Sequence, residues 1–187
     1  MGELLHAQKQ RSPGLMLHMA VSAVDGGVAI APHLVPEKTT VTSKYYCDLL
    51  KSTTLPRVRL AMQGRTWWWQ QDGASPHTAN STTSFLKECK VPLLHKKWPA
   101  CSACLNPLDY FVWSKLKDEL FLTKQYATDS TADLQTSALM VLQKFDDDPE
   151  WKAQLRKACL SFRYRCEQIV HNDGKLIVKK RTKKEYA

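Results

Sequence analysis

Two aspartates stand where the chain could bind a metal ion. Asp72 follows an aromatic run in Gln70-Gln71-Asp72-Gly73-Ala74, and Asp109 lies just after Asn106-Pro107. Side chains at the carboxyl ends of strands in an open α/β sheet face the ligand crevice, which favours a metal-binding role for Asp72. Asp-Gly is also a common turn dipeptide, so a purely structural turn remains the alternative for Asp72.

Asp109 also has two interpretations. Asn106 suits an N-cap and Pro107 the first helical position, so Asp109 would lie in a first turn that the helix dipole makes favourable for an acid. The same placement, close to a carboxylate at the end of a strand, would let the two acids share a divalent cation. Hard carboxylate oxygens hold Mg²⁺ while leaving positions for water and phosphate. Phosphoryl transfer with two ions would need a third carboxylate.

Other chemically competent groups are weaker candidates. Cys101 and Cys104 form a single Cys-x-x-Cys, with His95 and Cys89 at irregular spacing, whereas a structural zinc site needs four ligands. Two apolar loop thiols explain that pair equally well. His77 would contact a phosphate or begin the next helix. The tryptophans 67–69 would stack on bases or pack in a core, and strand alternation favours the core for most of them.

Composition and charge narrow the class of protein. The chain has 187 residues, 43% hydrophobic and 24% charged, with a formal net charge of +9, and its six cysteines suit reduced thiols. No run reaches 18 apolar residues, which predicts no membrane partner. The positive charge favours a polyanion such as DNA. Basic candidates for phosphate contacts, some of them compatible with nuclear import, are Lys96, Lys97, Lys179, Lys180, Arg181, Lys183 and Lys184.

The elements that must position these residues follow from local patterns. Asp25-Gly26-Gly27 between two apolar runs predicts a β-hairpin over 15–35. Thr42 and Ser43 predict the capped start of a helix that runs to Leu50, and a second helix is expected over 78–89. Short strands are expected over 65–71 and 91–94. Further helices are expected over 107–122, 130–145 and 149–169, with a last short strand at 176–180. This order predicts an α/β domain over 15–170, a disordered lead-in at 1–14 and a basic tail at 171–187.

These motifs, in this order, resemble the catalytic domain of mariner-superfamily transposases. The resemblance rests on LHMAVSAVD (17–25), VTSKYYCDLL (41–50), WQQDGASPHTA (69–79) and LNPLDYFVW (105–113). It implies a ribonuclease H-like mixed sheet with flanking helices and a helical C-terminal extension. It also implies that Asp72 and Asp109 are the second and third catalytic, metal-binding carboxylates of a DNA-cleaving and DNA-joining enzyme that uses Mg²⁺ or Mn²⁺. Thirty-six residues separate the two aspartates, a spacing typical of that family.

The sequence also departs from this pattern. Ser102-Ala103-Cys104 replaces the family's Ser-Pro-Asp, and the family's first catalytic aspartate and central strand would precede residue 17, where residues 1–14 hold no aspartate. A sheet without that strand leaves unpaired edges, and low stability, a homodimer or an incompletely delimited sequence would follow. Asp25, Glu37 or a partner could supply a third acid.

Three functions therefore compete. A catalytically impaired, transposase-derived DNA-binding protein in the nucleus ranks first, an active transposase second and an inert remnant third.

Overall fold

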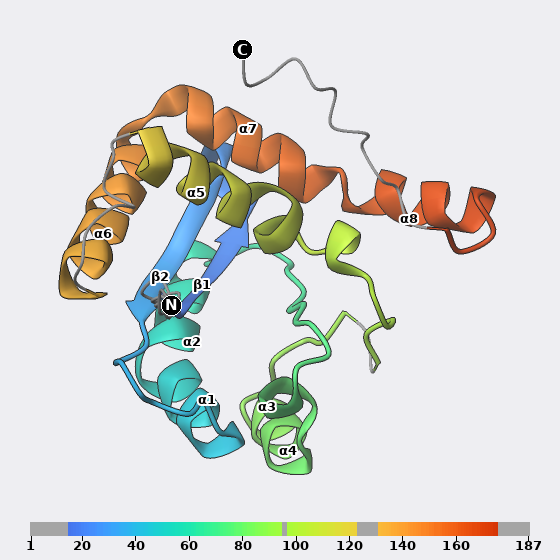
Figure 1. Cartoon of the computed structure of the whole chain (residues 1–187). Helices are drawn as coiled ribbons and strands as arrows, with labels where there is room; N and C mark the ends of the chain where they lie inside the picture. The colour runs from blue at the N-terminus through green and yellow to red at the C-terminus, as the bar shows by residue number, and fades with distance from the viewer. Residues whose placement is uncertain (1–14, 95–96, 123–130, 176–187) are drawn as a thin grey trace, which may run out of the picture.

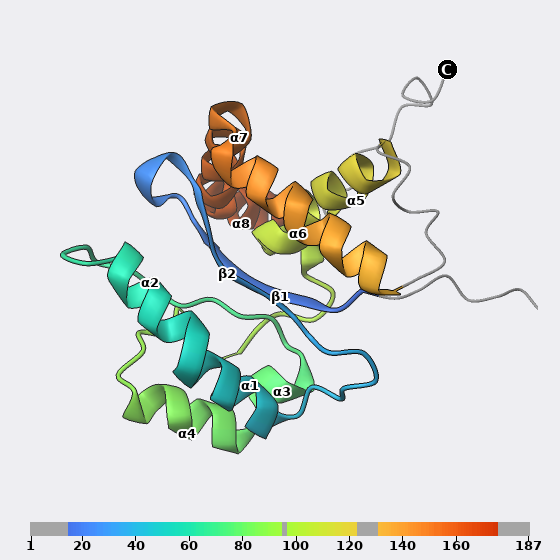
Figure 2. The same cartoon turned by 90° about the vertical axis from the view of Figure 1, so that its left-hand side faces the viewer.

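The computed structural model describes residues 15–94, 97–122 and 131–175, and these form three layers, with a short sheet between two layers of helices. Figures 1 and 2 show the sheet in the middle, with helices α1–α4 on one side and α5–α7 on the other. In this part of the chain no helix is both long and apolar enough to cross a membrane. The α/β class expected from the sequence is confirmed.

The predicted hairpin forms the sheet. Strand β1 (Leu17–Ser22) pairs antiparallel with β2 (Val28–Leu34), and a 3₁₀ turn at Val24–Gly26 joins them. Gly26 and Gly27 both have positive φ, which explains the glycines of this turn. Along β1, Leu17, Met19 and Val21 face one helical layer while Ala20 faces the other, so both faces of the hairpin are covered.

Helices α1 (Ser43–Leu49) and α2 (Leu55–Ala61) cover one face. The Thr42 hydroxyl accepts a hydrogen bond from the backbone N–H of Tyr45 at 3.2 Å, as expected of an N-cap. A π-helical turn over Leu50–Thr54 continues α1 into α2, so the helix runs well beyond the predicted end at Leu50. Helices α3 (Ser75–Thr78) and α4 (Asn80–Glu88) complete this layer.

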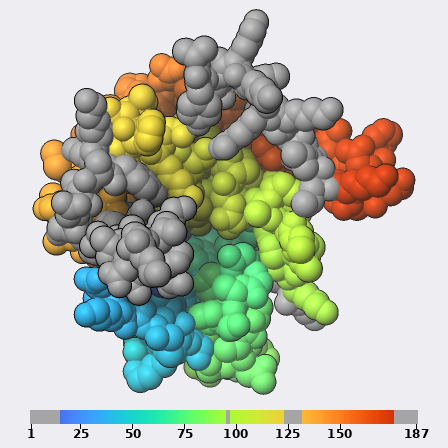
Figure 3. All heavy atoms as spheres, in the orientation of Figure 1, coloured from blue at the N-terminus to red at the C-terminus, as the bar shows by residue number. Residues whose placement is uncertain are grey.

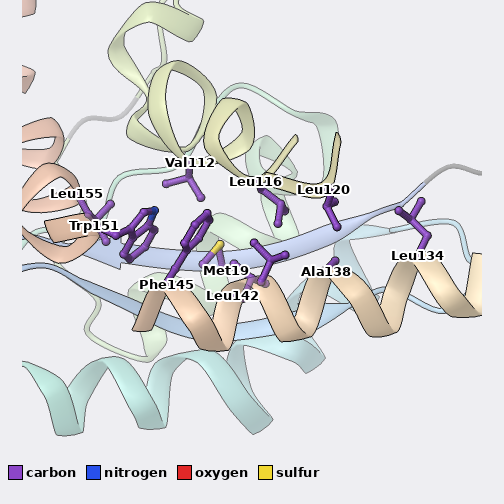
Figure 4. Packing of buried hydrophobic residues seen from close by; sticks show 11 residues of the cluster. Met19, Val112, Leu116, Leu120, Leu134, Ala138, Leu142, Phe145, Trp151 and Leu155 are labelled. Atoms are coloured by element: carbon purple, nitrogen blue, oxygen red, sulfur yellow. The ribbon is translucent and has the colours of Figure 1, made fainter. Parts of the chain in front are cut away.

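The other face is covered by three helices. They are α5 (Trp113–Leu122), which follows a π-helical turn at Leu108–Val112, α6 (Thr131–Asp147) and α7 (Pro149–Leu160). Figure 4 shows their side chains meeting over β1, with the rings of Phe145 and Trp151 stacked 4.9 Å apart.

The predicted helix over 149–169 is in fact two helices. Residue Ser161 separates α7 from α8 (Phe162–His171), which projects from the body in Figures 1 and 3 and has no buried residue.

Two predicted strands are reduced to a single bridge. Trp69 pairs in parallel with Leu93, and no longer ladder forms over 65–71 or 91–94 in the described chain. The prediction of full strands there was wrong. Within the described residues, the backbone of Trp69 bonds only along one edge, to Pro92 and Leu94. The strand expected at 176–180 lies outside the described residues.

Candidate active site

Asp72 is held by its own turn and by a histidine. One carboxylate oxygen, Oδ1, accepts the backbone N–H of Ala74 at 3.0 Å and lies 2.6 Å from Nδ1 of His77. Helix α3 begins at Ser75 with a proline in its first turn, which brings His77 back over Asp72. The His77 hydrogen bond is the main cause of the lowered pKa of Asp72, and the carboxyl is therefore ionised near neutral pH.

A buried polar network fixes the His77 side of the site. The His77 ring packs 4.4 Å from the ring of Tyr46, and the Tyr46 hydroxyl donates to Gln71 Oε1 at 3.1 Å. The Gln71 amide donates to the His77 carbonyl at 2.8 Å, and Trp69 Nε1 also donates to Gln71 Oε1. These bonds tie α1, α3 and the Trp69 segment together. Residues 69–77 are thus positioned by the fold as well as by their own turn.

His18 of β1 adjoins this network. Its ring lies 5.8 Å from that of Tyr46, and its Nε2 is 3.1 Å from the Thr54 hydroxyl. Burial, aided by the nearby His77 and His33, lowers the pKa of His18 to about 4. His18 is therefore neutral at pH 7.

Asp109 reaches the same region from the start of the α5 segment. Asn106 Oδ1 accepts the backbone N–H of Leu108 at 3.2 Å, so Asn106 acts as the predicted cap. The pKa of Asp109 is raised, first by burial and also by the negative charge of Asp72. Sequence analysis predicted that these carboxylates would lie near each other, and in the structure both face the same cleft.

Both carboxylates line one large cleft. Its volume is about 1120 Å³, and its walls include all of β1, residues 65–72, the segment around Asp109 and part of α7. The remaining candidate acids do not join the two aspartates. Asp25 lies where β1 ends and pairs with Arg65 at 2.8 Å, and Glu37 is exposed and does not line the cleft.

The donor set fits one hard divalent cation. Mg²⁺ binds proteins through one or two carboxylates and completes its octahedron with water and phosphate oxygens. Asp72 and Asp109 provide such a pair in a solvent-accessible cleft. Within the described residues no three Asp, Glu, His or Cys side chains are grouped to hold a metal, so the pair is what the chain offers here.

The basic and aromatic candidates named from the sequence differ in where they lie. Lys97 is exposed, while Lys96 and the basic residues 179–184 lie outside the described residues. Of the three tryptophans, Trp69 is 8% exposed and Trp67 packs on the core, as predicted for most of them, but Trp68 is 62% exposed.

Sequence reasoning missed Tyr46, Gln71 and Arg156 as parts of the site. Only the proximity of Gln71 to Asp72 could have indicated one of them. Tyr46 lies within the helix predicted to end at Leu50, far from Asp72 in the sequence, and Arg156 reaches the cleft from a helix that no local pattern ties to it.

Comparisons with known proteins bear on the fold of the chain. No protein-family model matches the chain. The Tcb1 transposase of Caenorhabditis briggsae is 35% identical over 81 residues, which are 43% of this chain and 28% of that protein. The chain thus matches less than a third of that relative's length.

Solved structures match over most of the chain. The crystal structure of the catalytic domain of Mos1 mariner transposase has a TM-score of 0.62 at 17% identity, covering 89% of this chain and 85% of that one. The Mos1 strand transfer complex gives 0.64 at 19% identity, over 95% and 48%. The ribonuclease H-like fold and the resemblance to mariner-superfamily transposases are confirmed.

Proposed function

We propose that this chain, which has the fold of a mariner transposase catalytic domain, is a transposase-derived protein that binds DNA at the cleft of Asp72 and Asp109. The observation that carries the proposal is the convergence on one cleft of a ribonuclease H-like fold of two carboxylates with 36 residues between them in the sequence. Mos1 provides a precedent, because its solved complexes include one with the left transposon end.

Electrostatics supports a polyanionic partner. The net charge is +9, and Arg65 and Arg156 line the same cleft as the acids. Cations at the rim would hold phosphates, and the acids would need a bound cation before a phosphodiester could approach them. We expect Lys97 and the basic run of 179–184 to add phosphate contacts outside the cleft, as the sequence predicts.

The binding test is a salt titration of fluorescence anisotropy with labelled duplex DNA. The logarithm of affinity should fall linearly with the logarithm of salt concentration, with a slope of about −0.9 per phosphate contacted. Replacing Lys179, Lys180, Arg181, Lys183 and Lys184 by glutamine should flatten that slope. Lys144→Gln is the control, because Lys144 already pairs with Glu119 on the outer helices. An affinity that does not change with salt concentration would refute the proposal. So would an equal change of the salt dependence in both variants.

Asp72 and Asp109 would hold Mg²⁺ or Mn²⁺, in keeping with the Mos1 catalytic domain structures that include these ions. Such an ion supplies charge stabilisation at a phosphodiester and lowers the pKa of a bound water. The protein's own part is to orient the ligands. His77 fixes Asp72 Oδ1 from one side, and the Asn106 cap sets the helix start that presents Asp109.

We further propose that cleavage is impaired in the chain as it stands. Two grouped carboxylates are fewer than two-metal phosphoryl transfer uses. The alternative, an active transposase, is supported by the retention of both aspartates. Incubation of DNA with Mg²⁺ or Mn²⁺ separates these functions. Strand cleavage that disappears in Asp72→Asn would establish the enzyme, whereas salt-sensitive binding that survives Asp72→Asn without cleavage would establish the binder.

Nuclear localisation and self-association complete the proposal. The basic run 179–184 has the composition of an import signal, and a fluorescent fusion compared with its glutamine variant tests it. The Mos1 structures include paired-end complexes, which favours a homodimer here. Light scattering with and without DNA measures the mass directly. A fusion that stays in the cytoplasm would overturn the nuclear localisation. A strictly monomeric mass would overturn the self-association.

A further inference from the structure

Helix α8 meets the body of the chain beside the segment that leads to Asp109. It has no buried residue, and it contacts the 3₁₀ turn at Ala103–Leu105 and the end of α7. Arg165 supplies the polar part of this contact. Its Nη1 donates to the carbonyl of Cys104 at 3.0 Å, and its Nε donates to the Ser161 hydroxyl at 3.2 Å. A guanidinium bonds two such acceptors at once because its donors are fixed in one plane.

The flat face of the same guanidinium lies on the ring of Tyr110. Its central carbon is 3.7 Å from the ring centroid, which is a cation–π distance. The Tyr110 hydroxyl donates to the Ala158 carbonyl at 2.6 Å. Tyr110 directly follows Asp109 in the π-helical turn over Leu108–Val112. Arg165 and the end of α7 therefore hold the residue next to the acid from two sides.

The segment before the acid is held at two successive carbonyls. The first, that of Cys104, accepts from Arg165. The second, that of Leu105, accepts from the Gln70 amide at 3.5 Å. Gln70 lies two residues before Asp72, so this bond, although long, connects the segments of the two acids. The backbone between the two carbonyls and the π-helical turn is thus fixed at both of its ends.

Arg163 of the same helix offers a matched comparison. Its side chain is 90% exposed, and its Nε donates to Glu167, one turn further along α8, at 2.9 Å. Exposed pairs of this kind contribute little to stability. The two arginines carry the same charge on the same helix, and Arg165 bonds a distant segment whereas the printed partner of Arg163 belongs to α8 itself.

We propose that Arg165 is a positioning residue of the metal site. By holding the Cys104 carbonyl and the Tyr110 ring, it sets the place of the acid between them, Asp109. This inference rests on the proposed function, in which Asp109 and Asp72 hold Mg²⁺ or Mn²⁺. Helix α8 then belongs to the site, although it projects from the body (Figure 1).

Charge and positioning predict opposite effects on metal affinity. Removing a cation from the neighbourhood would by itself strengthen the binding of a divalent ion, because like charges repel. Loss of a residue that holds a metal ligand in place weakens it, typically by about 10–100-fold. We therefore expect Arg165→Gln to bind Mn²⁺ about tenfold more weakly. Arg165→Lys should also weaken binding, because an ammonium keeps the charge but does not form the planar fork. Arg163→Gln removes the same charge and should not weaken it.

The first measurement titrates the full chain with Mn²⁺, and electron paramagnetic resonance determines the concentration of free ion. Asp109→Asn identifies the binding that belongs to the site, because that binding should be lost in this variant.

Hydrogen exchange is the second measurement, and it needs no metal. The amides of Asp109 and Tyr110 donate to the Asn106 carbonyl at 2.9 and 3.1 Å. They should exchange at least about tenfold faster in Arg165→Gln, because their segment loses a partner. The Met62 amide at the end of α2, in the opposite helical layer, should exchange at an unchanged rate.

The outcomes separate this inference from the proposed function. Equal Mn²⁺ affinity of the wild-type chain and Arg165→Gln, or an equal decrease in Arg163→Gln, would overturn the inference. Unchanged exchange of both amides in Arg165→Gln would also overturn it. If Arg165→Gln does not unfold cooperatively, Arg165→Lys is measured in its place. A wild-type chain that binds no Mn²⁺ would overturn the proposed metal site, and the exchange rates would still decide whether Arg165 holds the segment of Asp109.

Discussion

Gly27 lies where the hairpin turn meets the backbone of α7. A Cβ built on Gly27 would lie 2.2 Å from the carbonyl oxygen of Lys152 and 2.9 Å from the backbone nitrogen of Arg156. Both neighbouring atoms belong to the backbone, which cannot rotate away as a flexible side chain can, so α7 or the hairpin must move. Because Arg156 and Cys159 of α7 line the cleft, this contact also sets the position of one cleft wall.

Gly27→Ala and Gly26→Ala form a matched pair. Both residues have positive φ, so each alanine carries about 1–2 kcal/mol of backbone strain. Around Gly26 no atom lies within 4 Å of the added carbon, so strain is its whole cost. Gly27→Ala adds an overpacking cost of about 1–3 kcal/mol. The total of about 2–5 kcal/mol is a large part of an ordinary domain's stability.

Urea unfolding followed by tryptophan fluorescence measures both variants. With a slope of about 2 kcal/mol per molar urea, the Gly27→Ala midpoint should lie about 0.5–1.5 M below that of Gly26→Ala. Coincident midpoints would mean that α7 does not approach the turn as the structure places it, and the argument about the cleft wall would fail with it.

Three further predictions concern the core, the buried histidine and the α7–α8 junction. Leu155→Ala should lower the free energy of unfolding by about 2–5 kcal/mol, because Leu155 is fully buried, whereas Leu160→Ala should change it by less than about 0.5 kcal/mol, because Leu160 is 57% exposed. The urea midpoints of the two variants measure the difference, and equal losses would contradict this packing. The pKa of His18 is lowered from 6.5 to about 4 in the folded chain, so the unfolded chain binds the extra proton and the free energy of unfolding should fall by about 3 kcal/mol as pH drops from 6.5 to 4. Urea unfolding over a pH series should show that His18→Gln loses this pH dependence. An unchanged pH dependence would exclude His18 as its source. Tyr110→Phe removes the 2.6 Å bond from its hydroxyl to the Ala158 carbonyl and should cost about 1 kcal/mol in thermal unfolding, whereas no loss would show that the bond is replaced by water.

The local elements were largely predictable from the sequence. The Asp25-Gly26-Gly27 turn, the Thr42 cap and the Asn106-Pro107 helix start all form where the residue types predict them. Each depends on interactions within a few residues, which the sequence order itself brings together. The motifs around Asp72 and Asp109 were recognisable for the same reason.

Which residues from distant parts of the sequence lie together was decided by the tertiary structure. The coupling of Asp72 with Asp109, the burial of His18 and the exposure of Trp68 depend on which surfaces pack together. A single aromatic run produced a buried Trp69 and an exposed Trp68, because neighbouring side chains of an extended segment point to opposite faces and only the face of Trp69 packs on a core cluster. Strand periodicity states which side chains share a face, whereas packing against distant elements decides which face is covered.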